Sequence, residues 1–352
     1  MKVKTFILFL IVAIYTGIAW VEKTRTVTPI TFEVPTNWPT PIYNFSENPI
    51  SKEGFELGKE LFYDGILSID GNFPCASCHQ QFGAFNNYDH VLSHGYNNQL
   101  TLRNAPALQN LAWQKSFMWD GSIEKLDNQI FVPLNAHNEM GETTQNVLKK
   151  LNKDTGYARK FKQVFQQESI DSVQLGKALS QFLLMLVSSN SKYDKVKKGE
   201  QQFTAQEQNG YNLFLKKCNN CHTEPLFSNQ QLANNGFLPD NTLNDFGKYN
   251  TTKNNMDYMS FKVPSLRNAQ VTFPYGHDGR FFRLYPAIKH YHDGIVVYDN
   301  LDSSLVNSIN LNPQEIGQLI VFINTLTDSS FLSNPMFAPK DFVISPSLMH
   351  TH

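Results

Sequence analysis

Cys75-Ala-Ser-Cys78-His79 and Cys218-Asn-Asn-Cys221-His222 together contain all four cysteines of the 352-residue chain. Each segment has the pattern C-x-x-C-H, which is typical of covalent attachment of a c-type haem. Two thiols at this spacing can each bond to one vinyl group of the haem, and the next residue is then placed to bind the iron. The sequence therefore predicts two covalently bound haem c groups, attached through Cys75, Cys78, Cys218 and Cys221, with His79 and His222 as iron ligands.

A zinc site and a pair of disulfides are the alternatives for these cysteines. Structural zinc sites normally use cysteine pairs closer than the 143 residues (218 − 75) between the two motifs, and they need no His after each pair. Exported proteins commonly form disulfides, but disulfides do not explain the two following histidines either. Both alternatives are therefore disfavoured relative to haem attachment.

The N-terminus has the pattern of an export segment. Two lysines in the first four residues precede an apolar run from Thr5 to Trp20, as in a secretory signal or an uncleaved anchor. Residues 1–20 therefore predict a periplasmic protein, with membrane attachment only through this segment. A buried first helix is the alternative.

The net charge of −1 excludes the strongly basic surface that nucleic-acid binding requires.

Several landmarks around the first haem motif recur around the second. They are Gly58–Phe62 with Gly210–Phe214, Leu102–Ala105 with Leu266–Ala269, and Trp119–Gly121 with His277–Gly279. The last pair continues in register at an offset of 158 residues, so that Leu126 matches Leu284. This self-similarity predicts an internal duplication of one haem module.

Apolar periodicity predicts helices over residues 53–63, 147–151, 157–166, 172–187 and 204–217, and a last helix from Pro313. Thr204 and Glu207 form a capping-box pattern at the start of one of them, and strand signals are few. We therefore expect an all-α fold of two cytochrome c-like domains related by internal duplication. The expected bounds are 45–190 and 200–335, with the Ser- and Lys-rich segment 188–202 as the linker.

The repeat also predicts that the two haem sites differ. At the offset of 158, Tyr291 in the second copy corresponds to Pro133 in the first. Proline has no side chain able to bind iron, whereas a tyrosine oxygen can do so. If this position faces the haem, the second iron is bound by His222 and Tyr291, and the first iron has no ligand from this position.

Residues 48–331 resemble the bacterial dihaem cytochrome c peroxidases and their relative MauG. The matching motifs are Leu57-Gly-Lys-x-Leu-Phe62, Arg103-Asn-Ala-Pro106, Phe117-x-Trp-Asp-Gly121, Glu139-Met-Gly141, Phe261-Lys-Val-Pro-Ser-Leu-Arg-Asn268 and Thr272-x-Pro-Tyr275. The resemblance implies that the haem on His79 reacts with peroxide. It also implies that Glu139 is the distal acid–base residue, that Gln129 orients peroxide, and that Trp119 relays electrons between the haems.

The resemblance implies further ligands. Asn104, Thr272 and Pro274 match the inter-domain calcium ligands, through one amide and two backbone carbonyls, and hard oxygen ligands suit calcium. His94 is close to where the peroxidases have a distal histidine on the first haem in the resting state. The second haem usually has a methionine ligand in the peroxidases and a tyrosine in MauG, so Tyr291 makes this site similar to that of MauG.

Three functions follow from these residues. The leading one is a peroxidase that reduces hydrogen peroxide to water at the N-terminal haem, with electrons from a small redox protein, a cytochrome c or a cupredoxin, relayed through the C-terminal haem. The second is a MauG-like oxidase that draws electrons from a partner protein. The third is a dihaem electron carrier with no enzymatic activity. Dimers are common in the family, and the sequence leaves a homodimer open.

Overall fold

The computed structural model describes residues 27–88 and 90–339, so the predicted export segment at residues 1–20 lies outside the described residues. Within the described ranges the fold is mostly helical, as predicted, with one small sheet. The helices are α1 (Lys52–Tyr63), α2 (Leu126–Gln129), α3 (Phe131–Asn135), α4 (Thr144–Lys153), α5 (Thr155–Phe165), α6 (Ser172–Leu184), α7 (Lys192–Lys197), α8 (Ala205–Lys217), α9 (Tyr249–Thr252), α10 (Leu284–Asp293), α11 (Pro313–Asn324) and α12 (Ser329–Leu332). No helix in these ranges is long and apolar enough to span a membrane.

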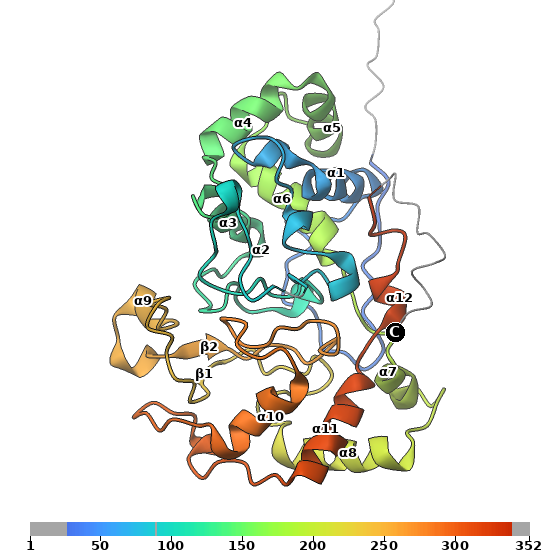
Figure 1. Cartoon of the computed structure of the whole chain (residues 1–352). Helices are drawn as coiled ribbons and strands as arrows, with labels where there is room; N and C mark the ends of the chain where they lie inside the picture. The colour runs from blue at the N-terminus through green and yellow to red at the C-terminus, as the bar shows by residue number, and fades with distance from the viewer. Residues whose placement is uncertain (1–26, 89, 340–352) are drawn as a thin grey trace, which may run out of the picture.

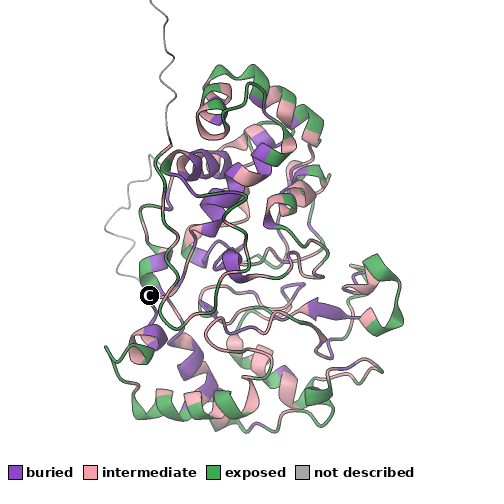
Figure 2. Ribbon diagram, turned by 180° about the vertical axis from the view of Figure 1, so that it is seen from behind, coloured by how far each residue is buried: buried purple, intermediate pink, exposed green. Residues whose placement is uncertain are grey.

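The two halves of the chain occupy different parts of the molecule. Helices α1–α6 form the upper part of the view in Figure 1, and α7–α11 form the lower part. The lower part also contains β1 (Leu232–Asn234), which pairs antiparallel with β2 (Ser260–Lys262). Helix α12 follows α11 back to the edge between the two parts. Figure 2 shows that buried residues concentrate along the inner helices, whereas α4, α5 and α9 expose much of their surface.

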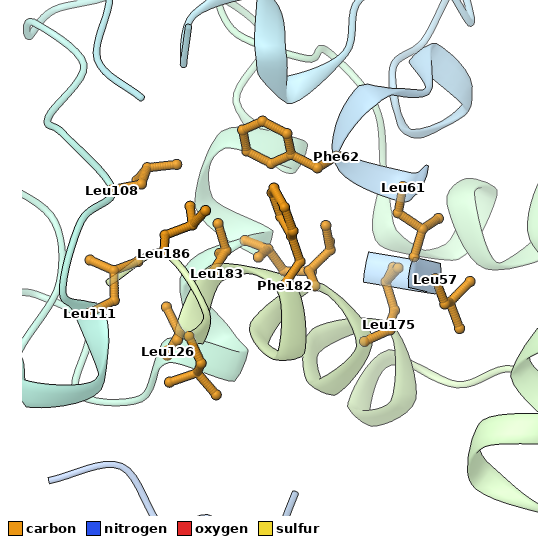
Figure 3. Packing of buried hydrophobic residues seen from close by; sticks show 14 of the residues in the cluster. Leu57, Leu61, Phe62, Leu108, Leu111, Leu126, Leu175, Phe182, Leu183 and Leu186 are labelled. Carbon is orange, nitrogen blue, oxygen red and sulfur yellow. The ribbon is translucent and has the colours of Figure 1, made fainter. Parts of the chain in front are cut away.

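The core of the first half forms where α1 packs against α6. Ser51 caps α1 by accepting a hydrogen bond from the backbone N–H of Gly54, which satisfies one of the free donors at the helix start. Phe62 and Phe182 then meet in the middle of the core with their ring centroids 5.1 Å apart (Figure 3). A β-carbon at Gly58 would overlap the Ala178 carbonyl oxygen, so the close approach of the two helices requires glycine there.

The second half repeats this arrangement with α8 and α11. Thr204 and Glu207 form the predicted capping box, and Asn312 with Glu315 forms another at the start of α11, with Pro313 in its first turn. A β-carbon at Gly210 would overlap the Gln318 carbonyl oxygen. The glycine of each repeated Gly–Phe landmark therefore allows two helices to approach closely.

The segment 188–202 differs from the predicted linker. It contains α7, whose Tyr193 and Asp194 are buried. Asp194 forms a two-pronged ion pair with the fully buried guanidinium of Arg267. Helix α7 is therefore part of the second core. The Ser- and Lys-rich composition was a misleading signal, because Arg267, the partner of Asp194, lies far along the chain.

The landmarks at an offset of 158 have the same backbone geometry. The N–H of Phe117 donates to the Ile123 carbonyl, and the N–H of Tyr275 donates to the Phe281 carbonyl, each at 2.7 Å. Helices α2 and α10 then begin at the matching residues Leu126 and Leu284. The first hairpin is followed by α2, which contains Gln129, and the second is followed by α10, which contains Tyr291. These paired segments therefore set the positions of the two residues.

Candidate functional site: the two C-x-x-C-H motifs and the cavity between them

The first motif forms a tight turn that places its histidine. The backbone N–H groups of Cys78 and His79 donate to the Cys75 carbonyl at 3.2 and 3.0 Å. The imidazole Nδ1 of His79 lies 2.7 Å from the Phe85 carbonyl oxygen. Burial lowers the pKa of His79, so the imidazole is neutral and Nδ1–H is the donor. The other ring nitrogen, Nε2, therefore keeps its lone pair for a metal.

The second motif has the same design. The N–H of His222 donates to the Cys218 carbonyl at 2.9 Å. Nδ1 of His222 lies 3.2 Å from the Phe227 carbonyl and 3.1 Å from the Pro264 carbonyl. Burial lowers the pKa of His222 as well. Phe85 and Phe227 both have positive φ angles, 59° and 54°, so in each motif a left-handed residue presents its carbonyl to the histidine.

These motifs fit haem. Both line one cavity of about 680 Å³ with mainly apolar walls. All four thiols are free and half-buried. Burial raises the pKa of Cys75 and of Cys218 to about 12. These thiols thus face a large apolar cavity, as haem attachment requires.

The predicted distal residues of the first haem line this cavity. Glu139 and Gln129 are both half-buried on its wall, and Pro133 lies between them in sequence. Burial raises the pKa of Glu139, and this carboxylate is close enough to influence Cys78 electrostatically. Nε2 of Gln129 lies 3.7 Å from the Met118 sulfur, which fixes the carboxamide. The structure therefore places Glu139 beside the first motif and Gln129 on the wall of the same cavity.

Tyr291 lines the cavity beside the second motif. It lies on α10, and both Cys218 and Cys221 influence its hydroxyl electrostatically. Burial raises the pKa of Tyr291, and a hydrogen bond with the Asn235 side chain partly opposes this shift. The backbone of Asn235 is held in turn, because its carbonyl lies 2.9 Å from Nε2 of His290. The phenol is thus positioned by residues that the sequence did not indicate.

Trp119 lies on the cavity wall where the two halves meet. Its indole N–H donates to the Asn104 carbonyl at 2.7 Å, and its own carbonyl accepts from the N–H of Lys262 in β2 at 2.7 Å. The buried ammonium of Lys262 is bonded to Gln114 and to the Ser116 carbonyl. Burial lowers the pKa of Lys262 to about 8. The indole is therefore bonded to the first half of the chain, and the backbone of Trp119 is bonded to the second.

The predicted calcium ligands also meet at the boundary between the halves. Nδ2 of Asn104 donates to the carbonyls of His90 and Val91 at 3.0 and 3.1 Å. Thr272 and Pro274 line the same cavity. The Asn86 side chain lies between Oδ1 of Asn104 and the Thr272 carbonyl, and no sequence pattern indicates this residue.

His94 lies in a loop beside the first motif, where its carbonyl oxygen is 3.9 Å from Sγ of Cys78. Its imidazole is exposed, its Nδ1 lies 2.7 Å from Oδ1 of Asn98, and its ring packs edge-on against His90. Its neighbours Ser93 and Gly95 line the cavity, but its own side chain does not. In this conformation the loop keeps His94 outside the cavity, so its role as an iron ligand stays a prediction.

Comparison with known proteins gives the family. Residues 52–202 match the family model of the di-haem cytochrome c peroxidases. The methylamine utilization protein MauG of Methylophilus methylotrophus is 30% identical over 300 residues, which cover 84% of this chain and 87% of that protein. The chain belongs to the di-haem cytochrome c peroxidase family. The resemblance inferred from the motifs is therefore confirmed.

Other relatives include both branches of the family. A cytochrome c551 peroxidase of Nitrosomonas europaea is 31% identical over 299 residues, or 83% of this chain and 86% of that protein. The crystal structure of a MauG-like protein associated with microbial copper homeostasis superimposes with a TM-score of 0.80 at 30% identity, covering 88% of this chain and 99% of that one. The family carries two haem c groups and comprises peroxidase-type oxidoreductases with electron-transfer activity.

Proposed function

We propose that the protein reduces hydrogen peroxide to water at the haem on His79, with electrons relayed through the haem on His222. The observation that carries this proposal is that different side chains stand beside the two motifs on the cavity wall. Glu139 stands beside the first motif, Tyr291 stands beside the second, and Gln129 lines the same cavity. When bound, each haem supplies an iron that can bind an oxygen ligand and exchange electrons.

Glu139 moves the proton in this proposal. Its carboxylate accepts a proton from one oxygen of hydrogen peroxide and returns it to the other oxygen, which leaves as water. With two electrons and two protons, one peroxide molecule gives two water molecules. Gln129 orients the peroxide, because Nε2 is held by the Met118 sulfur and Oε1 is left to accept from a peroxide hydroxyl. Trp119, fixed from both halves, relays electrons between the haems.

Tyr291 distinguishes the second site. Tyr291 has the position in the second half that Pro133 has in the first. Its phenol oxygen would bind the second iron together with His222, so that this haem stores and relays electrons. The matching hairpins and helix starts at an offset of 158 support descent of both sites from one duplicated module. They also support domains over residues 45–190 and 200–335, although segment 188–202 packs into the second core.

The remaining parts of the proposal concern location and partners. We place the protein in the periplasm, because haem c attachment through C-x-x-C-H motifs accompanies an N-terminal export pattern. A reduced cytochrome c or cupredoxin is the proposed electron donor. A calcium ion bound by Asn104, Thr272 and Pro274 would join the two halves near Trp119, since these residues come from both sides of the boundary.

A MauG-like oxidase is the second candidate, and Tyr291 favours it. MauG relatives are as similar to this chain as the peroxidases are, and the cavity offers a tyrosine beside the second motif. In that case the electrons come from side chains of a partner protein. Slow turnover with a reduced cytochrome c, together with a long-lived spectral change after peroxide, would favour this activity.

One experiment separates these functions from simple electron transfer. The two-haem protein is mixed with one equivalent of hydrogen peroxide while the Soret band is followed, and then reduced cytochrome c or a reduced cupredoxin is added. A peroxidase gives a fast spectral change and repeated oxidation of the donor. An electron carrier with both irons saturated gives neither, and that result would overturn the proposal.

A further inference from the structure

The side chain of Asn86 occupies the point where the two halves converge on the proposed calcium site. It is only 3% exposed. Its Nδ2 atom lies 3.1 Å from the Ala105 carbonyl oxygen, 3.4 Å from Oδ1 of Asn104 and 3.5 Å from the Thr272 carbonyl oxygen. Its own Oδ1 has no hydrogen-bond partner among the described residues. A buried amide with an unpaired carbonyl oxygen needs an explanation.

The contacts of Asn86 are poor as hydrogen bonds. An N–H···O bond is usually about 2.9–3.0 Å long, whereas two of these three distances are 3.4 and 3.5 Å. The amide also has two hydrogens for three acceptors. Three oxygens therefore face a group that satisfies them only in part, while the acceptor end of the same amide is buried without a donor.

The same distances suit oxygens that share a calcium ion. Calcium binds oxygen at about 2.3–2.6 Å, so two ligands at right angles around it are about 3.3–3.7 Å apart. If the amide group rotated by half a turn, Oδ1 would take the place of Nδ2. The distances from Oδ1 to three other oxygens would then be close to this spacing. Two of them, on Asn104 and Ala105, belong to the first half of the chain, and the third, on Thr272, belongs to the second.

We propose that Asn86 is an additional calcium ligand, which turns its Oδ1 toward the ion and joins Oδ1 of Asn104 and the carbonyls of Ala105 and Thr272. This inference rests on the calcium site proposed above. The present orientation leaves Oδ1 buried without a partner, and a cation at this point would favour the turned orientation. The bonds from Nδ2 of Asn104 to two carbonyls hold its Oδ1 toward the same point.

The position of Asn86 connects this site to the first haem motif. Phe85, the preceding residue, presents its carbonyl to Nδ1 of His79 at 2.7 Å. The carbonyl of Asn86 accepts from the N–H of Gln80 at 3.1 Å. Ala84 and Phe85 both have left-handed φ angles, 55° and 59°, so the turn has little freedom to adjust. A cation held by Asn86 therefore fixes the group that orients His79.

Calorimetric titration of the EDTA-treated two-haem protein with Ca²⁺ tests this role. We expect Asn86→Leu to weaken calcium binding by roughly tenfold or more, because the substitution removes one oxygen ligand. Asn86→Asp should strengthen binding, because it adds a negative charge at the same point. Asn48→Leu is the matched control, because Asn48 is an equally buried asparagine whose side chain bonds to Tyr43 and to the Lys177 carbonyl in the first half. Its affinity should stay within about threefold.

A second measurement reports the connection to His79 without any turnover. Removal of calcium should change the absorption and EPR spectra of the haem on His79 in the wild-type protein, and calcium should no longer restore them in Asn86→Leu. If the wild-type protein binds no calcium, the proposed calcium site fails. If Asn86→Leu binds calcium as tightly as the wild-type protein, Asn86 only fills the site and this inference is overturned.

The aspartate variant decides the case in which Asn86→Leu does not fold with both haems. Stronger binding by Asn86→Asp places residue 86 in contact with the ion, and a misfolded protein cannot produce that result. Unchanged or weaker binding by Asn86→Asp would overturn the inference.

Discussion

Glu139 is the residue on which the proposed chemistry depends most. Glu139→Gln keeps the size and shape of the side chain but removes its ability to accept a proton. We expect both haems to be attached normally and peroxide cleavage to slow by ~10²–10⁴, the usual contribution of general acid–base catalysis. Stopped-flow absorption after addition of peroxide measures this rate. Glu124→Gln, at an exposed position, is the control, and equal rates in the two variants would remove Glu139 from the mechanism.

The pH dependence of the same rate reports the environment of Glu139. Burial raises the pKa of this carboxyl above its usual value of 4.5. The base form exists only above that raised pKa, so the rate of peroxide cleavage should fall as the pH falls through it. The midpoint of this loss should lie above 4.5 in the wild-type protein, and Glu139→Gln should have no such midpoint. A wild-type rate that stays constant down to pH 4.5 contradicts the assignment.

Individual residues differed in how far the sequence could predict them. The haem-attachment residues were evident because C-x-x-C-H is a local pattern, and Glu139, Gln129 and Tyr291 followed from matched motifs and the repeat. The structure places these residues on one cavity, although their roles stay proposals. Asn86, Met118 and Asn235 were not predicted, because their partners lie tens of residues away or on another element.

Among the elements, the glycines at the helix crossings provide a direct test of packing. Gly58→Ala and Gly210→Ala should each lower the free energy of unfolding by about 1–3 kcal/mol, because the new methyl group overlaps a carbonyl of the facing helix. Chemical denaturation monitored by circular dichroism measures this change. Gly317→Ala on α11 is the control, since its β-carbon would have no neighbour within 4 Å.

The control substitution should have the opposite sign. Alanine has a higher helix propensity than glycine, so Gly317→Ala should raise the free energy of unfolding by about 0.5–1 kcal/mol. If all three variants change stability equally, the close crossings of α1 with α6 and of α8 with α11 are not what requires glycine.

The long helices were predictable and the packed connections were not. Apolar periodicity marked α1, α6 and α8, the Thr204–Glu207 capping box also marked α8, and Pro313 marked the start of α11, because these signals lie within each helix. Helix α7 was predicted as part of a linker, because its lysines suggested exposure. Its burial depends on the ion pair between Asp194 and Arg267, which joins residues 73 positions apart, and no local pattern contains that information.

For the whole molecule, Arg103 is the main ionic link between the two halves. Its guanidinium lies 2.8 Å from Asp120 in the first half and 2.6 Å from Asp245 in the second. Burial alone would raise the pKa of Asp120, but the Arg103 charge and the hydrogen bonds from Arg103 and Ser122 together outweigh burial and lower it. The contribution of this link to stability is therefore present at neutral pH and is lost as the pH falls below the usual value of 3.8.

Removal of Arg103 should lower the stability of the protein, because it breaks this ionic link between the halves. Arg103→Met leaves two largely buried carboxylates without their cation, and we expect a loss of about 3 kcal/mol in the free energy of unfolding. Thermal unfolding at pH 7 measures the effect. Lys289→Met is the control, because the side chains of Lys289 and its partner Asp293 are 47% and 48% exposed and an exposed pair contributes little. Equal melting temperatures for Arg103→Met and the wild-type protein would show that other contacts hold the halves together.

The two haem sites are unequal in this proposal, and resonance Raman spectroscopy of the oxidised two-haem protein reports the axial ligands of each. We predict two different sets of axial ligands, with iron–tyrosinate vibrations from one haem only and loss of those vibrations in Tyr291→Phe. Two equivalent haems, or no tyrosinate signal in the wild-type protein, would contradict the account.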